Sequence, residues 1–169
     1  MKQSISILVL SVVLLTIFGL DVWAQGKEET ESINVSWYVT TKVVPLGADR
    51  IYVTYEAIGL TVTDTGGGLF HGATARVLGG MTIEKGFYND EYACGVWNLP
   101  SGDKVFMTFK MAGKAGTGGV AKGPFTIIGG TGKCAGIQGS MEGTRTMVQS
   151  ALEVAGQSYL KGKLQYKLP

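Results

Sequence analysis

Residues 125–136 read FTIIGGTGKCAG, an apolar run followed by four glycines. A loop that holds the phosphates of a nucleotide needs such glycines, followed directly by a helix whose N-terminus favours negative charge. The Walker pattern is not met, because Ile127 stands where its first glycine should be and Cys134 follows Lys133 in place of Ser or Thr. The segment therefore does not predict a phosphate-binding loop of this type.

The residues around and after this loop indicate a turn between two strands. Ala135 occupies the third-glycine position of the dinucleotide fingerprint, so that motif is not met either. Glycines recur at Gly136, Gly139 and Gly143, and each would cost a helix about 1 kcal/mol. A strand accepts glycine where it bends sharply or where another backbone comes close. We therefore predict a hairpin with residues 130–132 in its turn.

Alternation of apolar and polar residues extends this prediction to the whole chain. The period-two pattern is clearest in residues 50–60, 104–111 and 160–168. Further strands are expected at residues 33–44, 71–79, 82–88, 92–99, 125–128 and 137–144. Residues 147–155 form the only candidate for a short helix, or else a wide loop. The spacing predicts an all-β fold of eight or nine antiparallel strands, in a sandwich or a barrel.

The N-terminal segment has the composition of a signal peptide. Lys2 precedes an apolar run at residues 5–20, which is shorter than the roughly 20 residues of a membrane-spanning helix. Val22 and Ala24 are the small residues of a cleavage site between Ala24 and Gln25. We expect residues 1–24 to be removed and residues 25–169 to be a single secreted or periplasmic domain without a stable membrane anchor. An uncleaved N-terminal anchor is the alternative.

Charge and cysteines set further limits. The net charge is +2, and it stays +2 without residues 1–24, which carry one lysine and one aspartate. This balance gives no electrostatic reason to expect a nucleic-acid partner.

Cys94 and Cys134 can form a disulfide in an oxidising compartment. Two buried free thiols are the alternative, because the sequence does not give the Cα separation that a disulfide requires.

The loop and the segments around it resemble a known family. FTIIGGTGKCAGIQG, an aromatic-led strand followed by GGTG and a small-residue strand, resembles the pattern of the allene oxide cyclase and dirigent barrel superfamily. Together with VTYEAIGLTVTDTGGGLFHGATAR, GDKVFMTFK and the terminal KLQYKLP, it is similar to a group of exported bacterial proteins of unknown function. The resemblance implies a calycin-like, eight-stranded antiparallel barrel with an apolar interior. It carries over no catalytic residue, because no position matches the acids of the plant enzymes.

Two residues are candidates for acid–base chemistry. His71 is the single histidine, and no ligand pair at metal spacing accompanies it, so we expect no metal site and no cofactor. It opens an expected strand, which suits a structural role at the barrel rim, but it is also the first choice for a general base. Glu56 lies mid-strand beside Tyr55 and is either a buried acid or an ordinary outward charge. Alternation favours the outward position, because the side with Tyr55 is the more apolar.

Other residues are candidates for ligand binding. Arg76 and Arg145 can each bind a carboxylate through the guanidinium fork, but arginine is rarely buried, so a surface position is favoured. The aromatic candidates for the core or for a ligand cavity are Tyr55, Tyr88, Tyr92, Trp97, Phe106 and Phe109. Sequence alone does not separate these two roles, because the interior of an eight-stranded barrel is either filled by side chains or holds one small ligand.

Three functions are compatible with these features. The first is an exported barrel that binds a small hydrophobic or aromatic ligand in its mouth or interior. The second is a cofactor-independent isomerase or cyclase-type enzyme with Glu56 or His71 as its acid or base. The third is a structural envelope protein, a homo-oligomer with a filled barrel. We rank them in this order, because no catalytic set is assembled in the sequence.

Overall fold

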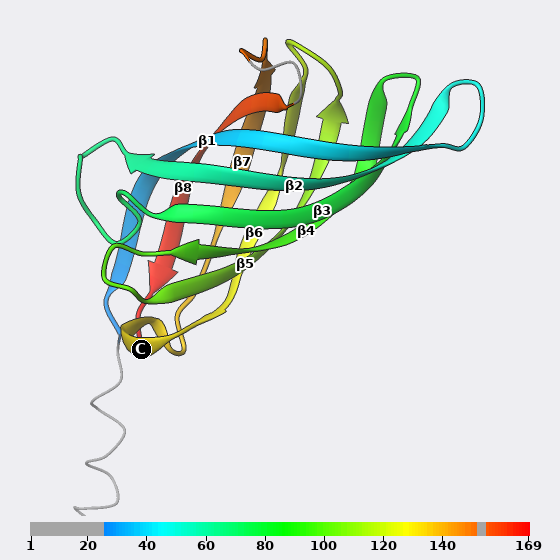
Figure 1. Cartoon of the computed structure of the whole chain (residues 1–169). Helices are drawn as coiled ribbons and strands as arrows, with labels where there is room; N and C mark the ends of the chain where they lie inside the picture. Colours follow the sequence, from blue (N-terminus) through cyan, green and yellow to red (C-terminus); the bar gives the residue numbers. More distant parts are fainter. Residues whose placement is uncertain (1–25, 152–154) are drawn as a thin grey trace, which may run out of the picture.

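The chain folds into a closed barrel of eight antiparallel strands (Figure 1). The computed structural model describes residues 26–151 and 155–169. Each strand pairs with the next along the chain, and the first pairs with the last to close the barrel. The strands are β1 (Glu28–Pro45), β2 (Arg50–Thr63), β3 (Thr74–Glu84), β4 (Phe87–Asn98), β5 (Lys104–Lys114), β6 (Val120–Gly130), β7 (Gln138–Val148) and β8 (Gly156–Lys167). The predicted all-β, eight-stranded barrel is confirmed.

The glycine-rich loop between β6 and β7 is a turn, but it is longer than a tight hairpin. It contains one 3-10 turn, η1 (Gly132–Cys134). Its start is tied to β5, because Thr131 N donates to Lys104 O and Lys104 N donates to Thr131 Oγ1, both at 2.9 Å. Cys134 and Ile137 of this connection are buried. The extra residues are therefore used to cover the core at this end of the barrel.

Inward-facing side chains alternate along the strands and fill the barrel. In β2, Val53, Tyr55 and Ala57 point inward and are buried, whereas Ile58, which follows Ala57, points outward and is exposed. The largest fully buried side chains include Trp97, Phe70, Phe125, Ile33, Met107 and Ile137. The barrel therefore has a packed core of the kind that eight strands enclose.

Strand β4 departs from strict alternation near its start. The register between β4 and β5 shifts between Tyr88 and Glu91. Residues three apart in a regular strand face opposite sides of a sheet. Both side chains are nevertheless buried. The register shift changes which side of the sheet the following side chains face, as β-bulges do. Tyr88 and Glu91 thus enter the barrel together.

The two ends of the barrel differ. The connections β2–β3, β4–β5 and β6–β7 meet at one end, here called the closed end, where Phe70 and Ile137 are buried. The Glu31 carboxylate accepts hydrogen bonds from the backbone N–H groups of Leu69 and Phe70, at 2.7 and 3.1 Å. The Tyr166 hydroxyl donates to the same carboxylate at 2.5 Å. The other connections lie at the opposite end, here called the open end.

Glycine at one inward position makes room for an aromatic pair. Gly59 of β2 lies opposite Trp37 of β1, and a Cβ atom there would lie 2.6 Å from the Trp37 ring. Trp37 packs edge-on against Trp97, with ring centroids 6.0 Å apart. A side chain at position 59 would displace this ring and overpack the core.

Some expectations are corrected or lie outside the described residues. The short helix proposed at 147–155 is wrong for its described part, because β7 continues to Val148 and residues 149–151 are irregular. The cleavage site between Ala24 and Gln25, with residues 1–24, lies outside residues 26–151 and 155–169. Within those ranges, no helix has the length and apolar character to span a membrane.

Candidate functional site

Four polar side chains meet inside the barrel, and we call them the interior cluster: Tyr55, Tyr88, Glu91 and Arg145. Arg145 Nη1 donates to Glu91 Oε1 at 2.7 Å, and Arg145 Nη2 donates to Glu91 Oε2 at 2.6 Å. Arg145 Nη2 also donates to Tyr88 Oη at 2.8 Å. The Tyr55 hydroxyl donates to Glu91 Oε1 at 2.5 Å. The arrangement is a bidentate ion pair with a tyrosine on each partner.

Three strands far apart in the sequence supply this cluster. Tyr55 occupies an inward position of β2, and Arg145 occupies an inward position of β7. Tyr88 and Glu91 come from the irregular start of β4. Since β4 and β7 do not pair with each other, the ion pair spans the barrel interior and links two non-adjacent strands.

The ion pair is shielded from solvent. The side chains of Arg145 and Glu91 are 9% and 0% exposed. Burying either charge alone costs several kcal/mol, so each requires the other. Burial lowers the pKa of Arg145, but the Glu91 carboxylate outweighs this effect and the net direction is upward. The guanidinium therefore stays charged at every pH at which the fold is stable.

Both tyrosines of the cluster remain protonated. Burial, and then the neighbouring Glu91 charge, raise the pKa of Tyr55 well above its ordinary value. Burial also raises the pKa of Tyr88, although Arg145 acts in the opposite direction. The phenols therefore serve as neutral hydrogen-bonding groups and not as bases.

A small cavity adjoins the cluster. It measures about 20 Å³ and is lined by Arg145, Tyr55 and Ser158 together with apolar side chains. Among the described residues, Arg145 Nε and Ser158 Oγ are buried polar atoms without a protein partner. Both atoms are therefore available for a hydrogen bond with a third group.

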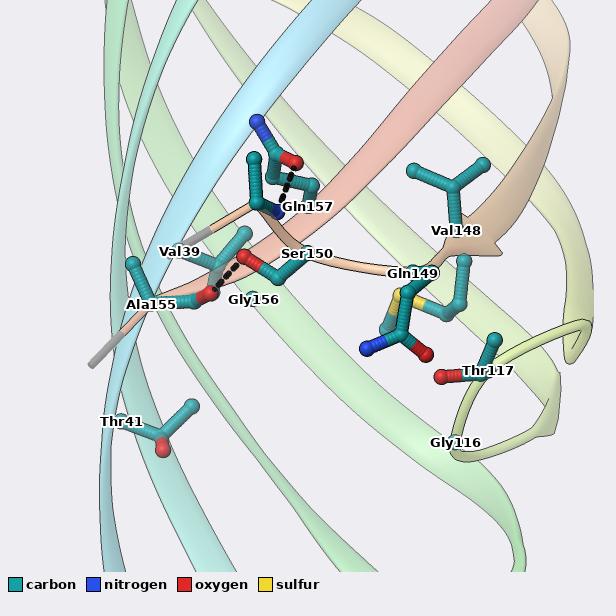
Figure 2. A pocket seen from close by; sticks show the side chains of 12 residues that line it. Val39, Thr41, Gly116, Thr117, Val148, Gln149, Ser150, Ala155, Gly156 and Gln157 are labelled. Atoms are coloured by element: carbon teal, nitrogen blue, oxygen red, sulfur yellow. Dashed lines mark hydrogen bonds between the residues drawn. The ribbon is translucent and has the colours of Figure 1, made fainter. Parts of the chain in front are cut away.

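A larger groove lies at the open end (Figure 2). It has a volume of about 520 Å³ and is lined by residues of β1, β7, β8 and the β5–β6 and β7–β8 connections. Its side chains are apolar or neutral polar, and they include Val39, Thr41, Thr117, Met147, Val148, Gln149 and Gln157. Val39 lines both the groove and the small cavity. The groove and the small cavity therefore lie on either side of the same residue.

Glu56 and Arg76 lie on the outer surface, as predicted for Glu56 from alternation and for Arg76 from the rarity of buried arginine. Arg76 Nε donates to Glu56 Oε1 at 2.6 Å, and their side chains are 63% and 37% exposed. The pair is directed away from the interior cluster, because even-numbered positions of β2 and β3 face outward. Neither residue is placed to bind a molecule inside the barrel.

His71 has local partners in the β2–β3 connection. Its Nδ1 accepts a hydrogen bond from Thr63 N at 3.2 Å and lies 3.1 Å from Thr63 Oγ1. Because Nδ1 accepts from a backbone N–H group, the ring proton of the neutral form is on Nε2. His71 belongs to the closed end and is not brought together with Glu56.

Arg145 corrects the sequence-based expectation of a surface position. Alternation in β7 already points it inward, but the low frequency of buried arginine argued against this position. Its partner Glu91 was not singled out, because the strands expected at residues 82–88 and 92–99 left it in the connection between them. The signal that could have identified this ion pair is a glutamate and an arginine that each occupy the apolar face of a strand.

The aromatic candidates divide between core and surface. Tyr55 and Tyr88 belong to the interior cluster, and Phe109 lines the small cavity. Trp97 is fully buried against Trp37. Tyr92 is 51% exposed on the outside of β4, so its placement in the core or a cavity is wrong.

The two cysteines are not joined. Cys94 is exposed on the outside of β4 and Cys134 is buried in the β6–β7 connection, and both are free thiols. Only Cys134 therefore matches the alternative of buried thiols. Among residues 26–151 and 155–169, no group of three or more His, Cys, Asp or Glu side chains is arranged to hold a metal ion.

Comparisons with known proteins add one structural likeness. No protein-family model and no curated protein matches the chain. The solved structure of a pterocarpan synthase dirigent protein is similar at 11% identity and a TM-score of 0.40, covering 91% of this chain and 96% of that chain. A likeness at this identity concerns the fold alone, so neither the reaction nor the ligand of that protein is carried over. Similarity to exported bacterial proteins stays a prediction.

We predict that the two charges of the interior cluster are strongly coupled. Glu91→Leu and Arg145→Met should each lower the free energy of unfolding by about 3–5 kcal/mol, because each leaves a buried charge uncompensated. The double variant should lose much less than the sum of the two. Urea unfolding of the three purified variants measures this coupling.

The outer pair provides the control for this cycle. Glu56→Gln breaks an exposed ion pair and should change the unfolding free energy by less than about 1 kcal/mol. Additive losses at Glu91 and Arg145 would contradict a coupled pair.

We also predict that stability falls in alkaline solution because of Tyr55. The unfolded chain ionises this tyrosine near pH 10, whereas the raised pKa keeps it protonated in the fold. Its contribution is therefore complete below about pH 10 and is lost as the pH rises, by up to about 1.4 kcal/mol per pH unit. Tyr55→Phe should show a shallower decline in urea unfolding above pH 10.

Tyr38→Phe is the matched control, because Tyr38 lies on the outer face of β1. Its curve should run parallel to that of the unmodified protein. If Tyr55→Phe also runs parallel, Tyr55 does not carry the alkaline loss.

Proposed function

We propose that the protein is a binding barrel that takes a small hydrophobic or aromatic molecule at its open end. The observation that carries this proposal is the groove of about 520 Å³, which shares the lining residue Val39 with the interior cavity. Its volume falls within the roughly 300–1,000 Å³ of small-molecule sites. A drug-sized or smaller molecule would therefore fit there.

The chemistry of the groove favours a neutral ligand. Met147, Val148 and Val39 provide apolar surface. The side-chain amides of Gln149 and Gln157 border it, and Gln157 Oε1 already accepts from Ala151 N at 2.8 Å. Among residues 26–151 and 155–169, none that lines the groove is charged, so an ionised ligand would lose hydration without gaining a charged partner from these residues.

Binding is better supported than catalysis. A cyclase-type reaction would require its substrate to reach Glu91, the buried carboxylate of the barrel. The adjoining cavity of about 20 Å³ has no room for a substrate. Glu56 and His71, the acid–base candidates from the sequence, lie outside the interior cluster. The groove at the open end therefore supports recognition of a molecule more directly than its conversion.

We further propose that the protein acts outside the cytoplasm after removal of residues 1–24. The support is the sequence of Lys2, the apolar run at 5–20 and the small residues Val22 and Ala24. Mass spectrometry of the exported protein should give a chain that begins at Gln25. A mature protein that still carries residues 1–24 would favour the uncleaved anchor instead.

We predict that filling the groove abolishes binding. Gly156 lies at the groove, and a Cβ atom there would make only ordinary contacts with Val39, at 3.7 and 3.9 Å. Gly156→Phe should therefore fold and occupy the groove with its ring. Binding of acetonaphthone, a neutral aromatic probe measured by its fluorescence, should weaken at least tenfold.

Gly47→Phe is the control, because it adds the same ring in the β1–β2 connection, where a Cβ atom has nothing within 4 Å. It should leave the affinity unchanged. Equal affinity for both variants and the unmodified protein would place the ligand elsewhere.

A further inference from the structure

We propose that the barrel holds one water molecule between Arg145 Nε and Ser158 Oγ, and that a neutral oxygen atom of the ligand replaces this water. The second part rests on the function proposed above, whereas the first part does not. The proposal assigns the chemical class of the ligand: an aromatic or apolar molecule with a carbonyl or hydroxyl oxygen, and not a carboxylate.

The first step of the argument is the pair of unpartnered atoms. The Arg145 side chain is 9% exposed and Ser158 is 4% exposed. Arg145 Nε and Ser158 Oγ are buried and have no protein partner. Leaving such a group unpaired costs about 1–3 kcal/mol, so buried polar groups are normally paired with protein or with water.

The second step is the position of these atoms. Arg145 lies opposite Leu160 in the β7–β8 register, and Ser158 lies opposite Met147. Arg145 and Ser158 are therefore diagonal neighbours on the inner face of two paired strands, within reach of a shared partner. Both residues line the same cavity.

The third step is the size of this cavity. Its volume of about 20 Å³ exceeds the roughly 10–15 Å³ that one water needs. A water there accepts from Arg145 Nε and forms a hydrogen bond with Ser158 Oγ. Tyr55 also lines the cavity, and its oxygen can accept a third hydrogen bond. Two to four partners are what a buried water requires.

The fourth step is the charge. Glu91 already neutralises the Arg145 guanidinium through two hydrogen bonds. A ligand carboxylate at Arg145 Nε would therefore add a buried charge without a free cation to compensate it. A carbonyl or hydroxyl oxygen accepts the same N–H without this cost. The remaining walls are apolar, namely Trp37, Ala57, Val77, Phe109, Phe125 and Leu160, and they suit a ring or an alkyl group.

The fifth step is access. Val39 borders both the cavity and the open-end groove. A ligand whose body occupies the groove can thus direct one oxygen past Val39 toward Arg145. Because the cavity is small, the specificity lies in the oxygen atom that enters it and in the apolar surface that follows it.

A high-resolution crystal structure of the ligand-free protein tests the water site. We expect a density peak within hydrogen-bond distance of both Arg145 Nε and Ser158 Oγ, and we expect it to be lost or displaced in Ser158→Ala. Ser140→Ala, on the exposed side of β7, should retain the peak. A cavity without density in the unmodified protein would overturn the proposal, whatever the ligand.

Three probes with the same ring test the ligand class: acetonaphthone with a neutral acceptor, naphthoate with a charge, and ethylnaphthalene with neither. Acetonaphthone should bind about tenfold more tightly than the other two, the ratio expected for one net hydrogen bond. Ser158→Ala should reduce this advantage, and Ser140→Ala should not. Equal binding of all three probes would overturn the oxygen site and leave the binding function standing. If none of the three probes binds, the binding function is overturned, and the proposed ligand class with it. The crystal structure would still test whether the water is present.

Discussion

The ion pair between Glu91 and Arg145 is the constraint on which the interior of this barrel depends. Each charge is buried, and neither is compensated by any other described charge in the barrel. The pair therefore holds β4 and β7 at a fixed separation across the interior, although these strands share no hydrogen bonds. Tyr55 and Tyr88 complete the hydrogen bonding of the two ions, so that a third strand is tied to the same point.

This cluster divides the barrel into two parts with different roles. Toward the closed end, the aromatic core and the Glu31 carboxylate seal the connections against solvent. Toward the open end, the packing ends in a small cavity and then in a neutral groove. The interior is filled, so the recognition that we propose would be a property of the mouth and not of a large central chamber. A filled, ion-paired interior also gives the mouth a rigid support, which favours a preformed site.

Much of the fold follows from short-range patterns. Alternation in residues 50–60 and 160–168 predicted which side chains are buried, because one face of each strand must lie against the core. The glycine-rich loop was assigned to a turn because no helix can follow it. The residues of the interior cluster were harder to predict from the sequence. Alternation placed Glu56 outside. Arg76 and Arg145 were both assigned to the surface on the basis of residue type, which was wrong for Arg145, and its partner in β4 was not identified.

The sequence by itself therefore determined the all-β class of fold and the turn after residues 125–128, because these depend on residues close together in the chain. Only the tertiary structure decided the interior chemistry. Glu91 and Arg145 are 54 residues apart, and they meet because the barrel closes and because β4 is irregular where Tyr88 and Glu91 both turn inward. A single break in alternation reverses which side of the sheet a residue faces. The alternation of residues within one strand therefore does not predict an ion-pair partner that lies across the barrel.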